Sequence, residues 1–421
     1  MYDLQLFGIK VGLNNIRELL RCAGNRHDQF PCVHIAGTNG KGSTAAMIAS
    51  ILTASGYRTG LYTSPHLVRF NERVRIDGKE INDVDIVRHT KLLKGPIEKN
   101  KATFFEATTA IAFNYFAEQK VDIAVVETGL GGRLDATNVV NPIITIITNI
   151  GLEHVEYLGP TLAKIAFEKG GIIKPSVSCI TGISSPEAIQ VLRRIARSND
   201  ANLIEAGNVS SLRIQENTLR GLKVSLQTKK TSYAGFSVSL PGGHQAQNLR
   251  LAILAVELLQ NSRNFPKISE RTIVLGLSMV QRYARFRGRI DVLSNQPLLI
   301  ADVAHNPDGV DALVAALRKL IVGKVVLLFG VMKDKDYSAM IAAFRPMVRL
   351  GIAVSPAIDR SLESCAVVQE MQRFGVKAID GKSVSNGIEV ALNEVREAET
   401  ILLTGSHYVV GEAFRHLKIS A

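Results

Sequence analysis

Short apolar runs alternate with helix-like segments along most of the chain. Residues 32–36, 121–127, 143–148 and 177–181 are strand-like, and helical periodicities at 107–119 and 186–197 lie between or after them. Continuous apolar runs are typical of strands that are buried on both faces of a sheet. The pattern therefore predicts an α/β fold with a mostly parallel sheet covered by helices.

A different pattern interrupts this alternation in the middle of the chain. Residues 203–240 alternate polar and apolar positions, which predicts an antiparallel appendage, and 247–260 is again helical. Strand-like runs return at 298–302, 325–329, 352–354 and 401–404, each with a helix before or after it. Because Arg, Ser and Asn interrupt the core pattern near 289–296, we expect a domain at 1–290 and a smaller α/β domain at 297–421.

The strand-like run 32–36 leads into a glycine-rich turn and then a helix. The turn reads Gly37-Thr38-Asn39-Gly40-Lys41-Gly42-Ser43. Apolar residues then recur on one helix face, at Ala45, Ile48, Ile51 and Leu52, and Gly56 can end the helix. Glycines let the backbone approach an anion, and the helix N-terminus and the lysine supply positive charge. The turn therefore predicts a phosphate site, because a lysine in a turn that binds nothing has little structural use.

Composition and charge narrow the possible partners. The chain has 421 residues, of which 46% are hydrophobic and 21% charged, and its net charge is +12. These proportions describe an ordinary globular protein that is long enough for two domains. The basic residues are spread along the sequence, so an anionic small substrate beside a bound phosphate group explains the charge without a nucleic acid. A local run at Arg193, Arg194 and Arg197 suits a solvated helix face.

The cysteines and the chain start bear on the compartment. Cys22, Cys32, Cys179 and Cys365 are far apart and have no metal or redox spacing, so we expect thiols in a reducing compartment. We find no signal-peptide pattern and no apolar stretch as long as a membrane span. These observations predict a soluble, cytoplasmic protein without a membrane partner.

The glycine-rich turn also departs from the common P-loop, G-x-x-x-x-G-K-[ST]. It is shorter, and Gly42 stands where a hydroxyl residue is usual. This form resembles the ATP-dependent amide ligases of the Mur ligase superfamily. Further blocks stand in the order typical of the folylpolyglutamate synthase and dihydrofolate synthase family, at 63–67, 70–76, 127–138, 168–175, 302–307, 330–336 and 404–406. The resemblance implies a P-loop parallel-sheet ATPase domain and a smaller Rossmann-like glutamate-ligase domain.

The resemblance also implies roles at the nucleotide. The ATP-binding residues would be Gly37, Thr38, Asn39, Gly40, Lys41, Gly42, Ser43, Asn248, Arg289 and Asp302. Ser64, Glu127 and His154 would hold magnesium, and Lys41, His154 and Lys169 would be catalytic. Similar enzymes carbamylate the lysine at position 169, which then faces a second magnesium. Chemistry alone leaves this carbamate and a plain ammonium open.

On the acceptor side, the resemblance implies a pterin or folate site. It would use Thr103, Phe104, Phe105, Glu106, Arg133 and Asp135. A helix cap at Thr103 with ordinary core aromatics is an alternative for the first four residues. His305 and Asn306 would position the glutamate or line the interdomain cleft, with a structural turn as the alternative, and 333–336 would contact the incoming amino acid.

These parts together predict an ATP-dependent ligase. Resemblance implies that L-glutamate is added to dihydropteroate, to a reduced folate, or to both, through an acyl phosphate. One or two Mg²⁺ ions and ATP would be required, K⁺ is a further candidate, and we expect a monomer that binds no nucleic acid. The alternatives are a Mur-type cell-wall amino-acid ligase and another P-loop ATPase. The loop 24–31 departs from the family pattern, and the sequence leaves the choice of acceptor open.

Overall fold

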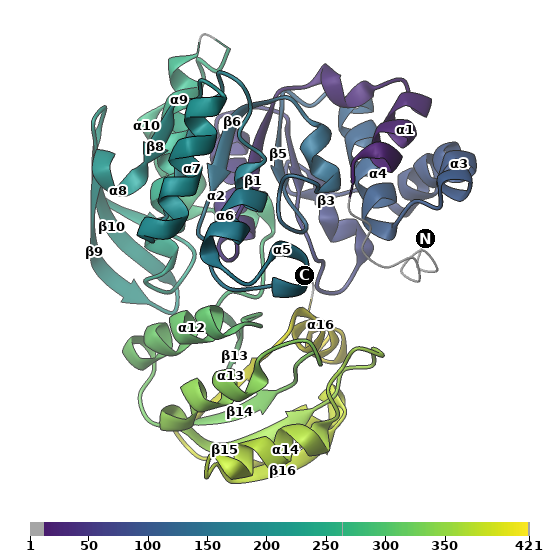
Figure 1. Cartoon of the computed structure of the whole chain (residues 1–421). Coiled ribbons are helices and arrows are strands. Elements are labelled where there is room, and N and C mark those ends of the chain that lie inside the picture. Colours follow the sequence, from purple (N-terminus) through teal and green to yellow (C-terminus); the bar gives the residue numbers. More distant parts are fainter. Residues whose placement is uncertain (1–11, 263, 420–421) are drawn as a thin grey trace.

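The computed structural model describes residues 12–262 and 264–419. The start of the first expected domain, at 1–11, and the end of the second, at 420–421, therefore lie outside the described residues. The described chain forms two α/β units, one above the other, each built around its own sheet (Figure 1). The first unit contains an eight-stranded and a three-stranded sheet, and the second contains a six-stranded sheet. The predicted α/β class with a smaller second unit is confirmed.

The eight-stranded sheet organises the first unit. Its strands are β1 (Cys32–Ala36), β2 (Thr59–Tyr62), β3 (Val74–Ile76), β4 (Lys79–Glu80), β5 (Ile123–Glu127), β6 (Pro142–Ile147), β7 (Cys179–Thr181) and β8 (Leu203–Glu205). They lie in the order β4-β3-β2-β5-β1-β6-β7-β8. All pairs are parallel except those of β3 and β4, which form an antiparallel edge that the sequence pattern did not predict.

Helices cover both faces of this sheet. One face packs on α2 (Lys41–Ala54), α9 (Gln245–Asn261), α10 (Glu270–Ser278) and α11 (Val280–Ala284). The other face packs on α1 (Asn14–Cys22), α3 (Asp83–Asn100), α4 (Phe104–Glu118), α6 (Leu162–Gly170) and α7 (Pro186–Ser198). Short turns complete the unit at α5 (Val155–Leu158), α8 (Ala206–Val209), η2 (Arg26–Gln29), η3 (Phe70–Arg73) and η4 (Ala136–Val139).

The helix after the glycine-rich turn, α2, is buried on nearly all sides. Every residue from Gly42 to Leu52 is buried, because the sheet lies on one side of α2 and α9, α10 and α11 lie on the others. A Cβ at Gly276 of α10 would lie 2.5 Å from the Cα of Ile51, so the two backbones are in close contact. The predicted helix is confirmed, and its predicted apolar residues Ala45, Ile48, Ile51 and Leu52 are buried. The remaining sides of α2 are buried as well, so its N-terminus is firmly held.

The antiparallel appendage is confirmed for most of its predicted length. β9 (Ser210–Thr218), β10 (Gly221–Thr228) and β11 (Ser232–Val238) form the three-stranded sheet, which packs against the α9 side of the first unit. The first predicted residues behave differently, since β8 joins the large sheet in parallel with β7.

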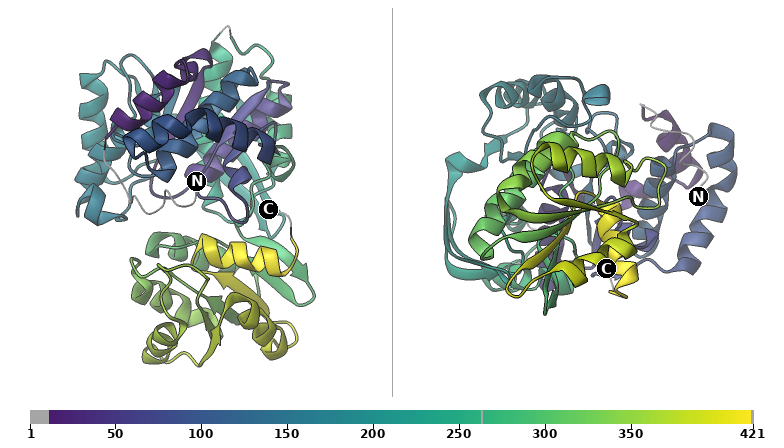
Figure 2. Two further views of the ribbon diagram at one scale, coloured as in Figure 1. Left: turned by 90° about the vertical axis from the view of Figure 1, so that its right-hand side faces the viewer. Right: turned by 90° about the horizontal axis from the view of Figure 1, so that it is seen from below.

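The second unit repeats the layered arrangement on a smaller scale. Its strands are β12 (Asp291–Asn295), β13 (Leu298–Ala301), β14 (Val325–Phe329), β15 (Val348–Val354), β16 (Ala378–Lys382) and β17 (Thr400–Thr404). α12 (Pro307–Leu320), α13 (Tyr337–Phe344) with η5 (Arg345–Met347), and α14 (Ser364–Arg373) cover one face. α15 (Val384–Glu394) and α16 (His407–His416) cover the other. Figure 2 shows α16 on the side that faces the first unit.

The segment near 289–296, where the domain boundary was expected, is mostly a strand. β12 pairs antiparallel with β13 and forms the edge of the second sheet. Val292 and Leu293 pack on the two opposite faces of this sheet. The polar residues that suggested a domain boundary also suit an edge strand, because an edge strand is partly exposed to solvent.

Two further sequence expectations can be compared with the fold. Cys32 and Cys179 are buried free thiols, while Cys22 and Cys365 are exposed. In the described part of the chain, no helix is both long and apolar enough to cross a membrane.

Candidate functional site

Two loops that follow neighbouring parallel strands form the centre of the candidate site. The loops after β1 and β6 lie side by side because these strands pair. The backbone N–H of Thr38 donates to the carbonyl of Asn149 at 3.0 Å, and that of Asn39 donates to Asn149 Oδ1 at 2.7 Å. The hydroxyl of Thr38 exchanges hydrogen bonds with the backbone of Gly151. The glycine-rich turn is therefore fixed from the side.

The glycines of the turn are required by its conformation and by their neighbours. Gly40 has a φ of +84° and precedes the first residue of α2, and Gly37 has a φ of +154°. A Cβ at Gly40 would collide with the side chain of Asn248, and one at Gly37 would collide with Thr148. No side chain caps α2, so its first N–H groups are available to an anion.

Lys41 adds a full positive charge at this helix end. Its Nζ donates to the carbonyl of Thr38 at 3.1 Å, so the side chain folds back over the turn. The charge of Lys41 affects the pKa of five groups from other segments, which are Glu127, Glu153, His154, Lys169 and His407. The predicted catalytic lysine thus lies among the predicted metal-binding and catalytic side chains.

Glu127 lies at the carboxyl end of β5, beside this charge. Its Oε2 accepts the backbone N–H of Ser64 at 3.2 Å, and only 4% of the residue is exposed. Burial raises the pKa of the Glu127 carboxyl, while Lys41, the Ser64 N–H and Arg289 oppose this rise. A pocket between the units includes Gly42, Ser64, Glu127, Phe286, Arg289 and His407 in its lining.

Arg289 reaches this pocket from the junction between the units. Its guanidinium lies 4.9 Å over the ring of Phe286, and burial lowers its pKa, opposed by the charges of Asp302 and Glu127. Both carboxylate oxygens of Asp302 accept backbone N–H groups at 2.8 Å. Arg287 instead pairs with Asp291 at 2.6 Å. The junction therefore places the Arg289 guanidinium in the lining of this pocket, together with the buried Arg75.

Lys169 is a buried amine beside the glycine-rich turn. Its Nζ donates to the carbonyl of Gly37 at 2.8 Å. Burial, together with the charge of Lys41, lowers the pKa of Lys169 to about 7. A lysine with this pKa is about half neutral at neutral pH, and the neutral amine is its nucleophilic form.

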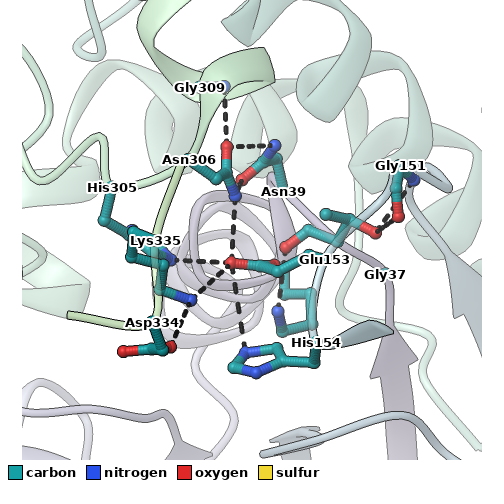
Figure 3. Close-up of polar contacts among 12 residues, drawn as sticks. Gly37, Asn39, Gly151, Glu153, His154, His305, Asn306, Gly309, Asp334 and Lys335 are labelled. Atoms are coloured by element: carbon teal, nitrogen blue, oxygen red, sulfur yellow. Dashed lines mark hydrogen bonds and ion pairs between the residues drawn. The ribbon is translucent and has the colours of Figure 1, made fainter. Parts of the chain in front are cut away.

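The loop after β6 carries Glu153, which joins the two units (Figure 3). Its Oε1 lies 3.1 Å from Asn306 Nδ2, 3.3 Å from His305 Nε2 and 3.5 Å from Lys335 Nζ. Burial alone would raise the pKa of Glu153, but His305, Lys335 and Lys41 hold it well below its usual range. Glu153 is therefore a carboxylate surrounded by positive charge from both units.

His154 follows Glu153 with a left-handed backbone. Its φ is +51°, and burial and the charge of Lys335 lower its pKa to about 4, so its ring is neutral at pH 7. A neutral imidazole is the form that binds a metal. Among the described residues, no group of three or more His, Cys, Asp and Glu side chains is arranged to hold a metal by itself.

Asn306 connects the second unit to the turn directly. Its Nδ2 donates to Asn39 Oδ1 at 3.1 Å, and Asn39 Nδ2 donates to Asn306 Oδ1 at 3.2 Å. Its Oδ1 also accepts the N–H of Gly309 and caps α12. Neighbouring His305 bonds to the carbonyl of Val303 through Nδ1 at 2.9 Å. His305 and Asn306 therefore both contact the first unit, as an interdomain placement predicts. Asn306 also caps α12, as the alternative of a structural turn predicts.

The predicted pterin residues Thr103, Phe104, Phe105 and Glu106 form the N-cap and the first turn of α4, and they make structural contacts there. Thr103 and Glu106 form a capping box, in which Glu106 Oε2 accepts the Thr103 N–H at 2.7 Å. The ring of Phe104 lies 5.3 Å from the guanidinium of Arg73, and Phe105 lies 6.1 Å from Tyr62. The alternative of a helix cap is therefore confirmed for Thr103. Phe104 also packs edge-on against Phe70, so both aromatic rings have partners within the first unit.

The loop after β5 also uses its charged residues internally. Asp135 accepts the backbone N–H groups of Gly129 and Leu130 at 2.9 and 2.8 Å, and it also bonds with Thr137. Arg133 forms a salt bridge with Glu168 at 2.8 Å and stays 43% exposed. Asp135 thus shapes the loop, whereas Arg133 lies at its accessible rim.

Two family models match the chain. They are the Mur ligase middle domain, over residues 35–256, and the Mur ligase glutamate ligase domain, over residues 288–407. The dihydrofolate synthase/folylpolyglutamate synthase of Bacillus subtilis (strain 168) is 34% identical, across 98% of this chain and 96% of its own length. The chain belongs to the folylpolyglutamate synthase and dihydrofolate synthase family of Mur ligases.

Solved structures of the family have the same fold over the whole described chain. A Mycobacterium tuberculosis folylpolyglutamate synthase complexed with ADP has a TM-score of 0.90 and 31% identity, covering 97% of this chain and 95% of its own. An Escherichia coli FolC in complex with DHPP and ADP has a TM-score of 0.87 and 27% identity, covering 97% and 94%. The family likeness thus extends through both units.

Several residues that surround the predicted site were not predicted from the sequence. Asn149, Gly151 and Thr148 fix the turn, and His407 lines the pocket, yet none was singled out. The first three directly follow β6, so the rule that ligand loops gather at the carboxyl ends of parallel strands was a usable signal. His407 begins α16 in the other unit, and only the packing of the units brings it to the pocket.

Proposed function

We propose that the protein is an ATP-dependent ligase that adds L-glutamate to dihydropteroate and to reduced folates. The observation that carries the proposal is a cluster of charged groups at the uncapped N-terminus of α2. Lys41 lies there with Glu127 from β5, Arg289 from the junction and Lys335 from the second unit. A polyphosphate and a second, anionic substrate suit such a cleft. The ADP in the related mycobacterial structure supports a nucleotide there.

The chemistry requires activation of an unreactive carboxylate. Transfer of the γ-phosphoryl group of ATP to the acceptor carboxylate gives an acyl phosphate and ADP. The amine of L-glutamate then attacks the acyl carbon, and phosphate leaves as the amide forms. Lys41 and the α2 N–H groups orient the polyphosphate, and Arg289 neutralises charge that develops on it. Contacts between the units keep water from the acyl phosphate.

Magnesium fits the residues beside the turn. Mg²⁺ commonly uses one or two carboxylates together with substrate phosphates, and Glu127 is a buried carboxylate next to the phosphate turn. Glu127, Ser64 and His154 would hold the ion, which supplies charge neutralisation for the β- and γ-phosphates. A carbamylated Lys169 would face a second ion, which its lowered pKa favours. K⁺ remains an additional candidate.

The acceptor side of the proposal rests on the first unit. The related FolC structure contains DHPP, and the acceptor residues proposed here are Thr103, Phe104, Phe105 and Glu106 with Arg133 and Asp135 of the loop after β5. Because Thr103, Glu106 and Asp135 already shape their loops, the direct contacts would fall mainly to Phe104, Phe105 and the accessible Arg133. We infer that one pocket accepts both dihydropteroate and the longer reduced folates.

An acceptor assay tests this proposal. We expect purified protein to release ADP in a glutamate-dependent manner with dihydropteroate and, separately, with tetrahydrofolate. Activity with only one acceptor would refute bifunctionality but keep the ligase. Turnover of a UDP-sugar peptide in place of both acceptors would identify a cell-wall ligase instead. Activity that depends on DNA or RNA would indicate another P-loop ATPase. The expected monomeric state and cytoplasmic location stay predictions.

A further inference from the structure

The contacts of Glu153 unite two separate loops of the second unit. His305 and Asn306 follow β13, whereas Lys335 lies in the loop between β14 and α13. All three donate to or pair with the same oxygen of Glu153, at distances of 3.1 to 3.5 Å. Figure 3 shows these side chains converging on Glu153 from the second unit. One carboxylate therefore fixes two second-unit loops relative to the first unit.

The surroundings explain why a negative charge is needed there. His154, Lys169 and Lys41 belong to the first unit, and each interacts electrostatically with Glu153. His154 is neutral, whereas Lys41 is charged and Lys169 is partly charged. Bringing Lys335 toward these two lysines without an intervening anion would place like charges together, which is unfavourable in a poorly solvated cleft. The Glu153 carboxylate separates them and is only 10% exposed.

Apart from the hydrogen bonds between Asn39 and Asn306, the other contacts between the units have a different character. A Cβ at Gly411 of α16 would collide with the backbone of Leu67, and one at Gly151 would collide with Asp308 of α12. Leu219, between β9 and β10, packs on the core of the second unit. These contacts fix how closely the units approach, but they do not hold the basic side chains in the cleft.

We propose that Glu153 is a positioning residue that holds His305 and Lys335 over the Lys41 turn and thereby sets the arrangement of the two units. Its effect on catalysis rests on the proposed ligase function, whereas its effect on the arrangement of the units does not. Shortening the side chain by one methylene would withdraw the carboxylate by about 1.5 Å. Contacts at 3.1 to 3.5 Å would then exceed hydrogen-bond distance.

The native cysteines allow the arrangement to be measured in the full chain. Cys22 of α1 and Cys365 of α14 are exposed, one in each unit, while Cys32 and Cys179 are buried. Nitroxide labels on the exposed pair report the distance between the units by pulsed electron paramagnetic resonance without nucleotide. We expect a narrow distribution for the wild type, and a broader or longer one for Glu153→Asp and Glu153→Gln. An Asp variant that overlays the wild type would overturn the proposal.

A matched control and a second partner sharpen the test. Glu156→Asp changes an exposed carboxylate three positions away, and it should leave the distance distribution and activity as in the wild type. Lys335→Met should broaden the distribution as Glu153→Asp does, and the double variant should add little to either change. If the change in the double variant equals the sum of the two single changes, Glu153 and Lys335 do not act through a shared contact. Far-UV circular dichroism verifies that each variant is folded.

Kinetics separate positioning from a merely structural role. We expect Glu153→Asp to lower kcat by about tenfold while the KM for ATP changes by less than about twofold, since the nucleotide turn itself is intact. A normal kcat in a variant with a broadened distribution would overturn the positioning role. If the wild type shows no ligase activity at all, the proposed function fails while the distance measurement still decides the arrangement of the units.

Discussion

At the scale of single residues, Lys41 is the side chain on which the proposed chemistry most depends. Its recorded hydrogen bond goes to a backbone carbonyl of its own turn, so removing it should not disturb the core. We expect Lys41→Ala to lower glutamate-dependent ADP release by at least about 100-fold, or roughly 3 kcal/mol in the activation free energy. The melting temperature should stay near that of the wild type. Lys94→Ala, at an exposed position of α3, is the control.

Glu127 and His154 are expected to act through magnesium rather than through the acceptor. Glu127→Gln removes a buried charge at the phosphate turn, and His154→Ala removes a neutral imidazole. Each should raise the Mg²⁺ concentration that gives half-maximal activity by about tenfold, with a smaller change in the folate KM. Magnesium titrations that coincide with the wild type would refute the metal assignment.

Lys169 has two possible roles with opposite pH dependences. Its pKa of about 7 means that the amine is mostly charged at pH 6 and mostly neutral at pH 8. Only the neutral amine reacts with CO₂, so we expect added bicarbonate to increase activity more at pH 8 than at pH 6. Carbon-13 NMR with labelled bicarbonate should show a carbamate signal that Lys169→Arg removes. Activity that falls as pH rises through 7, without such a signal, would favour the ammonium.

At the scale of elements, the N-terminus of α4 distinguishes structural from substrate-binding roles. Thr103 caps the helix and Glu106 completes the capping box. We expect Thr103→Ala to decrease the free energy of unfolding by about 1 kcal/mol, as loss of an N-cap usually does, and Thr103→Ser to restore it. Thermal unfolding measures this effect. A larger change in folate KM than in stability would show that Thr103 contacts the acceptor directly.

The interaction between whole units leads to a prediction about Asp302. Its carboxylate accepts backbone N–H groups from Ile290, in the junction, and Ala304, after β13. Because both proposed activities use one nucleotide site, Asp302→Ala should reduce ADP release with dihydropteroate and with tetrahydrofolate by the same factor. Parallel assays with both acceptors measure the ratio. A variant that loses one activity and keeps the other would refute the shared site.

Local signals in the sequence were sufficient for much of the fold and for the centre of the site. The strands at 32–36 and 325–329 match the structure residue for residue, since continuous apolar runs are recognisable wherever both faces of a sheet are covered. The turn around Lys41 could be predicted because its glycines are dictated by backbone conformation. Edge strands such as β12 were not recognised, because exposure to solvent removes the apolar signal.

The sequence by itself determined the α/β class, the two-unit organisation, the phosphate turn and, through its motifs, the family. Each depends on residues that are close in the chain or on a fixed order of motifs. Only the tertiary structure decided that α2 is buried on nearly all sides, that Asp135 bonds within its own loop, and that Glu153 pairs with Lys335. Those outcomes depend on the packing of segments far apart in sequence, where the distance between side chains, rather than their identity, determines which groups interact.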